Sequence, residues 1–262
     1  MKNIIIKARK KVFNLFSGHR HSNKHSEGLD FSELREYQIG DNVKRIDYKI
    51  TAKKQKPYIK LFNEERELNI IIVGLIDYKT YFGSKVLKYE KILETIATLG
   101  FSGIKSNDRV GIEIYSKNNI FIKPTKNLKS LSLLSKFNED IIDTKLNYKQ
   151  ILDSLIRHKK NSVLIIVSDF FIDYDFRKLG AKFDTYSVII RDRIEENPTI
   201  LNGLTIIDPI TNKSTIADFG NSYKAKILAN DTKLIQNFKK SNIKYIKLYT
   251  DEDILKLKNL FG

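Results

Sequence analysis

Cysteine is absent from the 262-residue sequence. Its absence excludes disulfides, thiol catalysis and thiolate metal sites. The sequence also has no apolar run of about 18 residues, the length that a membrane-spanning helix requires. Residues 1–16 carry only a short apolar patch that lysines interrupt, with no small-residue cleavage site after it, so we expect no secretory signal. These absences together predict a cytoplasmic protein.

Common nucleotide and hydrolase motifs are missing as well. The chain has no Gly-x-x-x-x-Gly-Lys-Ser/Thr loop, and no Gly-x-Gly-x-x-Gly follows its first long apolar run. It also lacks Gly-x-Ser-x-Gly, the turn that presents a nucleophilic serine. The sequence therefore shows no nucleotide cradle and no serine-hydrolase turn.

The chain is strongly basic, with 47 Lys and Arg against 31 Asp and Glu and a net charge of +16. Such a charge favours anionic partners. The lysines are spread along the chain, however, and abundant Lys, Ile and Asn are typical of AT-rich genomes, so nucleic acid is disfavoured as a partner. A membrane surface stays an alternative partner, because residues 1–16 predict a basic amphipathic helix that would lie on a bilayer without spanning it.

Apolar runs and helical patterns alternate after residue 66. Nearly continuous β-branched runs predict buried parallel strands. We expect strands at Leu68–Ile76, Val110–Tyr115, Ile120–Lys123, Val163–Ser168, Asp184–Ile190 and Lys244–Tyr249. We expect helices at Ser84–Lys105, Leu128–Lys136, Tyr148–His158, Asp231–Ser241 and Asp251–Leu260, with Ser84 and Asp231 as caps. The pattern predicts an α/β, Rossmann-type sandwich with a mostly parallel central sheet over residues 67–262.

Two hairpins and an N-terminal appendage complete the predicted organisation. Asn118 and Asn119 supply one hairpin turn, and a second hairpin is expected between Leu204 and Asp218. Residues 1–66 comprise the basic helix, a polar loop and a charged region with one strand at Tyr58–Phe62. The polar loop contains His19, His21 and His25, and a solvated loop is favoured there over a metal site because no acidic partner orders it.

Two predicted strands end on aspartates. The run Leu68–Ile76 leads into Asp77, and Ser162–Ser168 leads into Asp169. Sites in open α/β sheets lie at the carboxyl ends of the strands, and two carboxylates there could hold a divalent cation. The loop after Asp77 nevertheless offers Lys79, whose ammonium has three donors and no acceptor and so cannot bind a cation.

A second informative stretch runs from Phe31 to Tyr48. Gly40-Asp41 predicts a tight turn. Charged residues alternate with apolar anchors, and the members that we expect to matter are Arg35, Glu36, Tyr37, Gly40, Asp41, Arg45, Asp47 and Tyr48. Since an arginine can fork onto a carboxylate, we expect Arg35, Arg45, Asp41 and Asp47 to form an ion-pair network that docks the N-terminal region onto the sandwich.

These residues carry a resemblance to a known family. The motif Phe31-x-x-Leu-Arg-Glu-Tyr-x-x-Gly-Asp-x-x-Lys-Arg-Ile-Asp-Tyr, followed by Thr51-Ala-Lys and Phe62-x-Glu-Glu-Arg-Glu, closely resembles the bacterial domain of unknown function 58 family. The family usually has Trp where Tyr48 stands. The resemblance covers residues 28–169 and implies a von Willebrand factor type A-like domain. It also implies a MoxR-type AAA+ ATPase as partner, with other proteins of the same gene neighbourhood as further candidates.

Type A domains often hold Mg²⁺ at a metal-ion-dependent adhesion site, and the resemblance locates its counterpart here. The first loop of that site reads Asp-x-Ser-x-Ser, and this chain has Asp77, Lys79 and Tyr81 at those positions. Asp169 matches the third-loop aspartate, and the second-loop residue is Thr144 or Asn147. Because Mg²⁺ needs near-octahedral oxygen coordination, we expect a degenerate site without metal or cofactor. We further expect the Lys79 ammonium to neutralise Asp77, Asp169 or both.

The sequence therefore favours a non-catalytic interaction module over an enzyme. The favoured function is that of an adaptor or co-chaperone for a MoxR-type ATPase, with no catalytic residue. One alternative is a metal-dependent phosphoesterase or nuclease that uses Asp77 and Asp169, although such hydrolysis needs several ligands around one or two cations. The other alternative is a protein bound to the membrane surface through its basic N-terminus.

Overall fold

The computed structural model describes residues 29–64, 68–137, 144–198, 203, 205–207, 213–216 and 221–261. The helix predicted in residues 1–16 and the histidine-containing loop lie outside these residues. The described residues divide into two compact units, a smaller one of residues 29–64 and a larger one of the residues from Leu68 on. Among the residues described, no helix is long and apolar enough to cross a bilayer.

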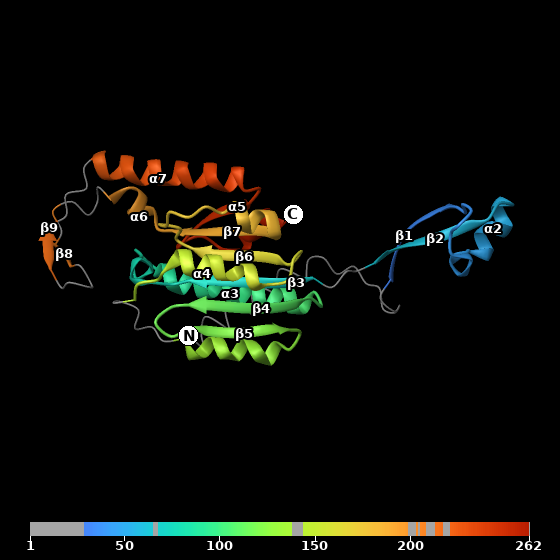
Figure 1. Ribbon diagram of the computed structural model, residues 1–262, viewed down its shortest axis with the longest axis horizontal. Coiled ribbons are helices and arrows are strands. Elements are labelled where there is room, and N and C mark those ends of the chain that lie inside the picture. The colour runs from blue at the N-terminus through green and yellow to red at the C-terminus, as the bar shows by residue number, and fades with distance from the viewer. Residues whose placement is uncertain are drawn as a thin grey trace. The chain divides into compact units, whose positions relative to one another are not determined.

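A six-stranded sheet forms the centre of the larger unit (Figure 1). In spatial order its strands are β10 (Lys244–Tyr249), β7 (Asp184–Arg191), β6 (Val163–Ser168), β3 (Asn69–Leu75), β4 (Arg109–Tyr115) and β5 (Ile120–Thr125). Neighbouring strands are parallel except β4 and β5. The predicted α/β fold with a mostly parallel central sheet is confirmed, and each predicted strand of that sheet is present.

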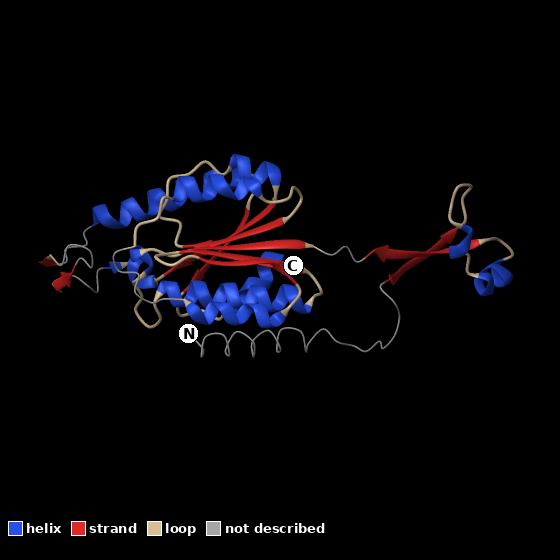
Figure 2. Ribbon diagram, turned by 60° about the horizontal axis from the view of Figure 1, so that its bottom comes forward, coloured by secondary structure: helices blue, strands red, loops and turns tan. Residues whose placement is uncertain are grey.

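Helices cover both faces of the sheet (Figure 2). One face packs against α3 (Lys88–Lys105), η3 (Leu128–Lys136), η6 (Ile254–Leu257) and α8 (Lys258–Phe261). The other packs against α4 (Tyr148–Ser154), η4 (Leu155–Arg157), α5 (Arg177–Lys182) and α7 (Asn221–Lys240). A Cβ at Gly74 of β3 would lie 2.4 Å from the Ile96 methyl group, so this glycine permits the close approach of α3. The continuous apolar runs are thus buried on both sides.

Several helix boundaries differ from the prediction. α3 begins at Lys88 rather than at Ser84, because the backbone N–H and hydroxyl of Ser84 both donate to the Asp192 carboxylate (2.8 and 2.9 Å). α7 begins at Asn221, so Asp231 lies inside that helix instead of capping it. The predicted C-terminal helix is a 3-10 turn followed by one short α-helix.

Both predicted hairpins of the larger unit are present. β8 (Thr205–Ile207) pairs antiparallel with β9 (Ser214–Ile216). Between β4 and β5 the side-chain oxygen of Asn119 accepts the Ser116 N–H (3.1 Å), which closes the turn.

The smaller unit is a two-stranded ribbon with two short helices in its connecting loop. β1 (Leu29–Glu36) pairs antiparallel with β2 (Tyr58–Glu64), and η1 (Val43–Arg45) and α2 (Tyr48–Lys54) lie between them. The sequence predicted β2 but not β1. Charged residues interrupt the alternation in β1, and it is pairing with β2 that supplies its backbone hydrogen bonds.

Candidate functional site

The order of the strands reverses between β3 and β6. From β3 the chain passes to β4 and β5 on one side and then returns to β6 on the other. Ligands of open α/β sheets bind beyond the carboxyl ends of the strands at such a switch point. Asp77 follows β3, Asp169 follows β6, and both are buried. The fold therefore brings these two aspartates to the same edge of the sheet, where the charge of one acts on the other. We call this place the carboxyl-edge site.

Both carboxylate oxygens of Asp77 accept hydrogen bonds. One accepts from the backbone N–H of Lys79 (3.0 Å), and the other accepts from the Tyr148 hydroxyl of α4. Burial raises the pKa of Asp77, the hydrogen bond from Tyr148 offsets part of that rise, and the charge of Asp169 raises the pKa further. Both oxygens of the Asp77 carboxylate thus already accept hydrogen bonds from other residues of the chain.

Asp169 is paired with a buried lysine. The Lys88 ammonium lies 3.1 Å from an Asp169 oxygen and 2.6 Å from a Glu195 oxygen, and the side chains of Lys88 and Asp169 are both 0% exposed. Burial alone would raise the pKa of Asp169, but the charges of Lys88 and Arg191 outweigh it and hold that pKa below its ordinary value. Burial alone would lower the pKa of Lys88, and the two carboxylates raise it instead. The site therefore contains its own cation.

Lys79 forms no ion pair with either aspartate in the described part of the chain, and of the neutralisation expected of it there is only the lowering of the Asp77 pKa by its charge. Its ammonium donates to the Phe171 carbonyl (3.2 Å) and lies 5.2 Å from the centre of the Tyr148 ring. The physical reason is the turn η2 (Tyr78–Thr80), which brings the Lys79 backbone N–H, rather than its ammonium, to Asp77. Tyr81 follows this turn, is 41% exposed and stacks on Tyr89 (5.9 Å between ring centres). Lys79 and Tyr81 thus belong to the rim of the site.

The loop after β6 adopts an uncommon backbone conformation. Phe170 has a φ of 53°, in the left-handed region that bulky residues rarely enter. The turn folds the Phe171 N–H back onto the Asp169 carboxylate (3.3 Å). The Phe171 ring centre lies 5.2 Å from the Lys88 ammonium and 3.8 Å from the Arg191 guanidinium carbon, within cation–π range of both. An aromatic ring therefore supports the buried cations.

Arg191 connects the carboxyl-edge site to a second group of charges. It is the last residue of β7, is fully buried and donates to Asp231 of α7 (2.6 Å). Asp231 also accepts from Lys247 (2.6 Å), whose ammonium donates in turn to Glu196 (2.6 Å). Charged groups at this edge of the sheet are thus compensated by one another.

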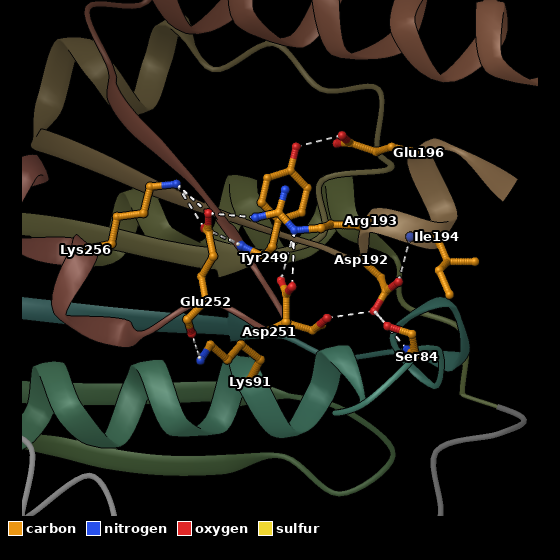
Figure 3. A network of polar contacts seen from close by, with 11 residues as sticks. Ser84, Lys91, Asp192, Arg193, Ile194, Glu196, Tyr249, Asp251, Glu252 and Lys256 are labelled. Atoms are coloured by element: carbon orange, nitrogen blue, oxygen red, sulfur yellow. Dashed lines mark hydrogen bonds and ion pairs between the residues drawn. The ribbon is translucent and has the colours of Figure 1, made fainter.

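A polar network continues from the end of β7 (Figure 3). Asp192 accepts from Ser84 and from the Thr250 hydroxyl (2.6 Å). The Arg193 guanidinium carbon lies 4.2 Å from the centre of the Tyr249 ring. These contacts fasten the loop before α3 and the loop after β10 to the end of β7, and they hold Lys88 in place at the start of α3.

Thr144, and not Asn147, lies against the first loop of the site. The Tyr78 N–H donates to the Thr144 carbonyl (3.1 Å), and Thr144 is buried. Asn147 is exposed and caps α4 by accepting the Gln150 N–H (3.1 Å). Within the described part of the chain, no group of three or more His, Asp or Glu side chains could hold a metal ion.

The motif residues predicted for docking lie in the smaller unit. Arg35 forks onto Asp41 (2.7 and 2.8 Å), and Asp47 caps α2 and pairs with Lys60 (2.9 Å). Arg45 is exposed and makes no ion pair with a described residue of the smaller unit. Within this unit it is Lys60 of β2, a residue outside the predicted network, that pairs with Asp47. Docking of this unit onto the sandwich stays a prediction.

Sequence reasoning missed Lys88, Glu195 and Arg191, although two of them carried a signal. Lys88 precedes the buried Ile92 by four residues, so the helical period places it on the buried face of α3. Arg191 directly follows the apolar run of β7, as Asp169 follows that of β6. Glu195 carried no pattern, because it lies in a helix of four residues.

Comparisons with known proteins give the family. A solved structure matches with a TM-score of 0.45 and 10% identity, covering 74% of this chain and 96% of the other. It is the crystal structure of an aerotolerance-related membrane protein from Bacteroides fragilis, with multiple mutations to serines. No curated protein matches the chain significantly. The model of the family "Protein of unknown function DUF58" matches residues 33–227, more than half of the chain. The chain therefore belongs to the DUF58 family.

Proposed function

We propose that the larger unit is a non-catalytic protein-interaction module with a von Willebrand factor type A-like fold. The observation that carries this proposal is the buried pair of Lys88 and Asp169, whose charged atoms are 3.1 Å apart with neither side chain exposed. In a type A domain the corresponding aspartate helps to hold Mg²⁺. Here Lys88 provides the positive charge, so the module would bind its partner without a metal.

The same contacts argue against the metal-dependent hydrolase. Such an enzyme needs carboxylates that are free to hold one or two cations and to activate water. Asp77 already accepts two hydrogen bonds, and Asp169 already has an ammonium beside it. A divalent cation would have to approach Lys88 against its charge, which is unfavourable in a buried site. We therefore assign no catalytic residue and no cofactor.

The partner that we propose is a MoxR-type AAA+ ATPase, which would make this protein a cytoplasmic adaptor or co-chaperone. The resemblance to the family motivates this choice. The binding surface would be the rim of the carboxyl-edge site, where Tyr81 is exposed and Lys79 lies beside it. Exposed tyrosines often supply a large share of the binding energy at protein interfaces.

Changing the rim should weaken this complex. We expect the double variant Lys79→Glu, Tyr81→Ser to lose at least tenfold in affinity for the ATPase, as hot-spot truncations do. Calorimetry or co-elution of the purified full chain with a MoxR-type ATPase from the same organism would measure it. The matched control is Leu128→Ser, since Leu128 is similarly exposed (46%) but lies at the opposite end of the sheet. Equal affinity of the rim variant and the wild type would refute this surface.

A further inference from the structure

The loop of the smaller unit is presented at one end of its ribbon. The register pairs Leu29 with Glu64 at one end and Glu36 with Tyr58 at the other. The chain enters and leaves the ribbon at the first end, and residues 37–57 connect the strands at the second. Seven paired positions at about 3.3 Å each separate the two ends by roughly 20 Å. We call residues 37–57 the ribbon tip.

Contacts within the smaller unit fix the shape of the tip, and both aspartates of the tip already have partners there. Asp41 accepts a fork of hydrogen bonds from Arg35 and a further one from the Gln38 N–H (2.8 Å). The Asp41 N–H donates to the Gln38 carbonyl (3.0 Å), which closes a turn with Ile39 and Gly40 as its two central residues. Gly40 has a φ of +105°, a conformation that glycine adopts without strain. Asp47 is committed to the α2 cap and to Lys60.

The tip therefore displays cations and apolar groups without compensating acids. The exposed cations that make no ion pair with a described residue are Lys44, Arg45, Lys49, Lys53 and Lys54. Three large apolar residues of the tip are exposed as well: Ile39 at 103%, Val43 at 57% and Tyr48 at 75%. They lie within ten residues of sequence, on the turn, on η1 and at the start of α2.

We propose that the ribbon tip binds the surface of a bilayer that contains anionic lipids. Lysines near such a surface are attracted to the headgroups, and adjacent aliphatic side chains enter the boundary between headgroups and acyl chains. A protein partner fits less well, since lysine is depleted at protein interfaces and a standard interface uses about 20–30 residues a side. Nucleic acid fits less well because Ile39 and Val43 offer nothing to a phosphate backbone.

Vesicle sedimentation of the full chain tests the charges of the tip. Binding to phosphatidylcholine vesicles should require added phosphatidylglycerol. Because each lysine near the surface contributes about a fivefold gain in partitioning, the variant Lys49→Gln, Lys53→Gln, Lys54→Gln should bind on the order of 100-fold more weakly. The matched control removes three exposed lysines of α7 (Lys226→Gln, Lys239→Gln, Lys240→Gln) and should bind like the wild type. Equal losses in both triple variants would overturn the proposal.

Fluorescence tests insertion directly, because the chain contains no tryptophan. A single tryptophan introduced by Tyr48→Trp should shift its emission to the blue when anionic vesicles are added, and one introduced by Tyr81→Trp should not. The variant Ile39→Ser, Val43→Ser should lose roughly tenfold in vesicle binding, because two aliphatic side chains no longer leave water. Unshifted emission from Tyr48→Trp, or tighter binding to duplex DNA than to anionic vesicles, would refute the assignment. Failure of the ATPase complex would not affect it, since that complex uses Tyr81.

Discussion

Replacing Lys88 with methionine should lower the free energy of unfolding by about 3–5 kcal/mol at pH 7. Methionine fills a similar volume but leaves Asp169 and Glu195 buried without their cation. An uncompensated buried charge costs more than the pair itself contributes. Urea unfolding of the purified chain would measure the loss. The control is Lys256→Met, which breaks a partly exposed pair with Glu252 four residues away and should cost no more than about 0.5 kcal/mol.

The pH dependence of the Lys88 defect distinguishes lost charge compensation from lost packing. In the wild type the pKa of Asp169 is held down, so this residue contributes stability above its unfolded pKa that is lost as pH falls. In Lys88→Met, burial should instead raise the pKa of Asp169, and protonation then removes the unpaired charge. The defect should therefore shrink from pH 7 toward pH 4. A defect of the same size at both pH values would mean that packing alone is responsible.

Replacing Glu113 with glutamine should remove about 3 kcal/mol of stability at neutral pH. Burial alone would raise the pKa of Glu113, but hydrogen bonds with His158, Tyr115 and Arg157 lower it from 4.5 to about 2. Because the pKa is depressed in the folded state, this stabilisation is present above pH 4.5 and disappears as pH falls toward 2. The wild type and the variant should thus differ at pH 7 and converge in acid, as measured by urea unfolding across that range.

Asp175 provides a matched control for Glu113. Its pKa is also lowered to about 2, by hydrogen bonds from Arg177, but both partners are exposed to solvent. Water and salt screen such a pair, so Asp175→Asn should change stability little at any pH. A Glu113→Gln variant that behaves like Asp175→Asn would show that the Glu113 cluster is screened as well and contributes little.

The sequence predicted the inner strands of the sheet well because they are buried on both faces. A strand such as β6, Val163–Ser168, is continuously apolar, and its short length and β-branched residues distinguish it from a buried helix. The first residues of helices were harder to predict, because a side chain that could cap a helix can instead bond to a residue far away in the sequence. Ser84 has a good capping side chain, yet Asp192, more than a hundred residues away, takes its hydrogen bonds. The strand β1 was missed because its own residues show no alternating pattern, and its strand conformation depends on pairing with β2.

The carboxyl-edge site was predictable in its acids but not in its cation. Asp77 and Asp169 each end an apolar run, and the strand order brings them together. The neutralising lysine could have been any of the many in this chain, and proximity in sequence favoured Lys79. In the turn after β3 the backbone N–H of Lys79, and not its ammonium, bonds to Asp77. The ammonium of Lys88, at the start of the long helix α3, pairs directly with Asp169. The helical period could have placed Lys88 on the buried face of α3, but nothing in a single sequence pairs it with an aspartate 81 residues away.

Calorimetric titration with Mg²⁺ and Mn²⁺ tests the central claim most directly, namely that Lys88 occupies the place of a metal at the carboxyl-edge site. The full chain, treated with a chelator and dialysed, would be titrated at neutral pH, with the variant Asp77→Asn, Asp169→Asn as the control for binding elsewhere. We expect no stoichiometric binding in the micromolar range and the same small heats for both proteins. Stoichiometric micromolar binding to the wild type that is lost in the double variant would contradict the account.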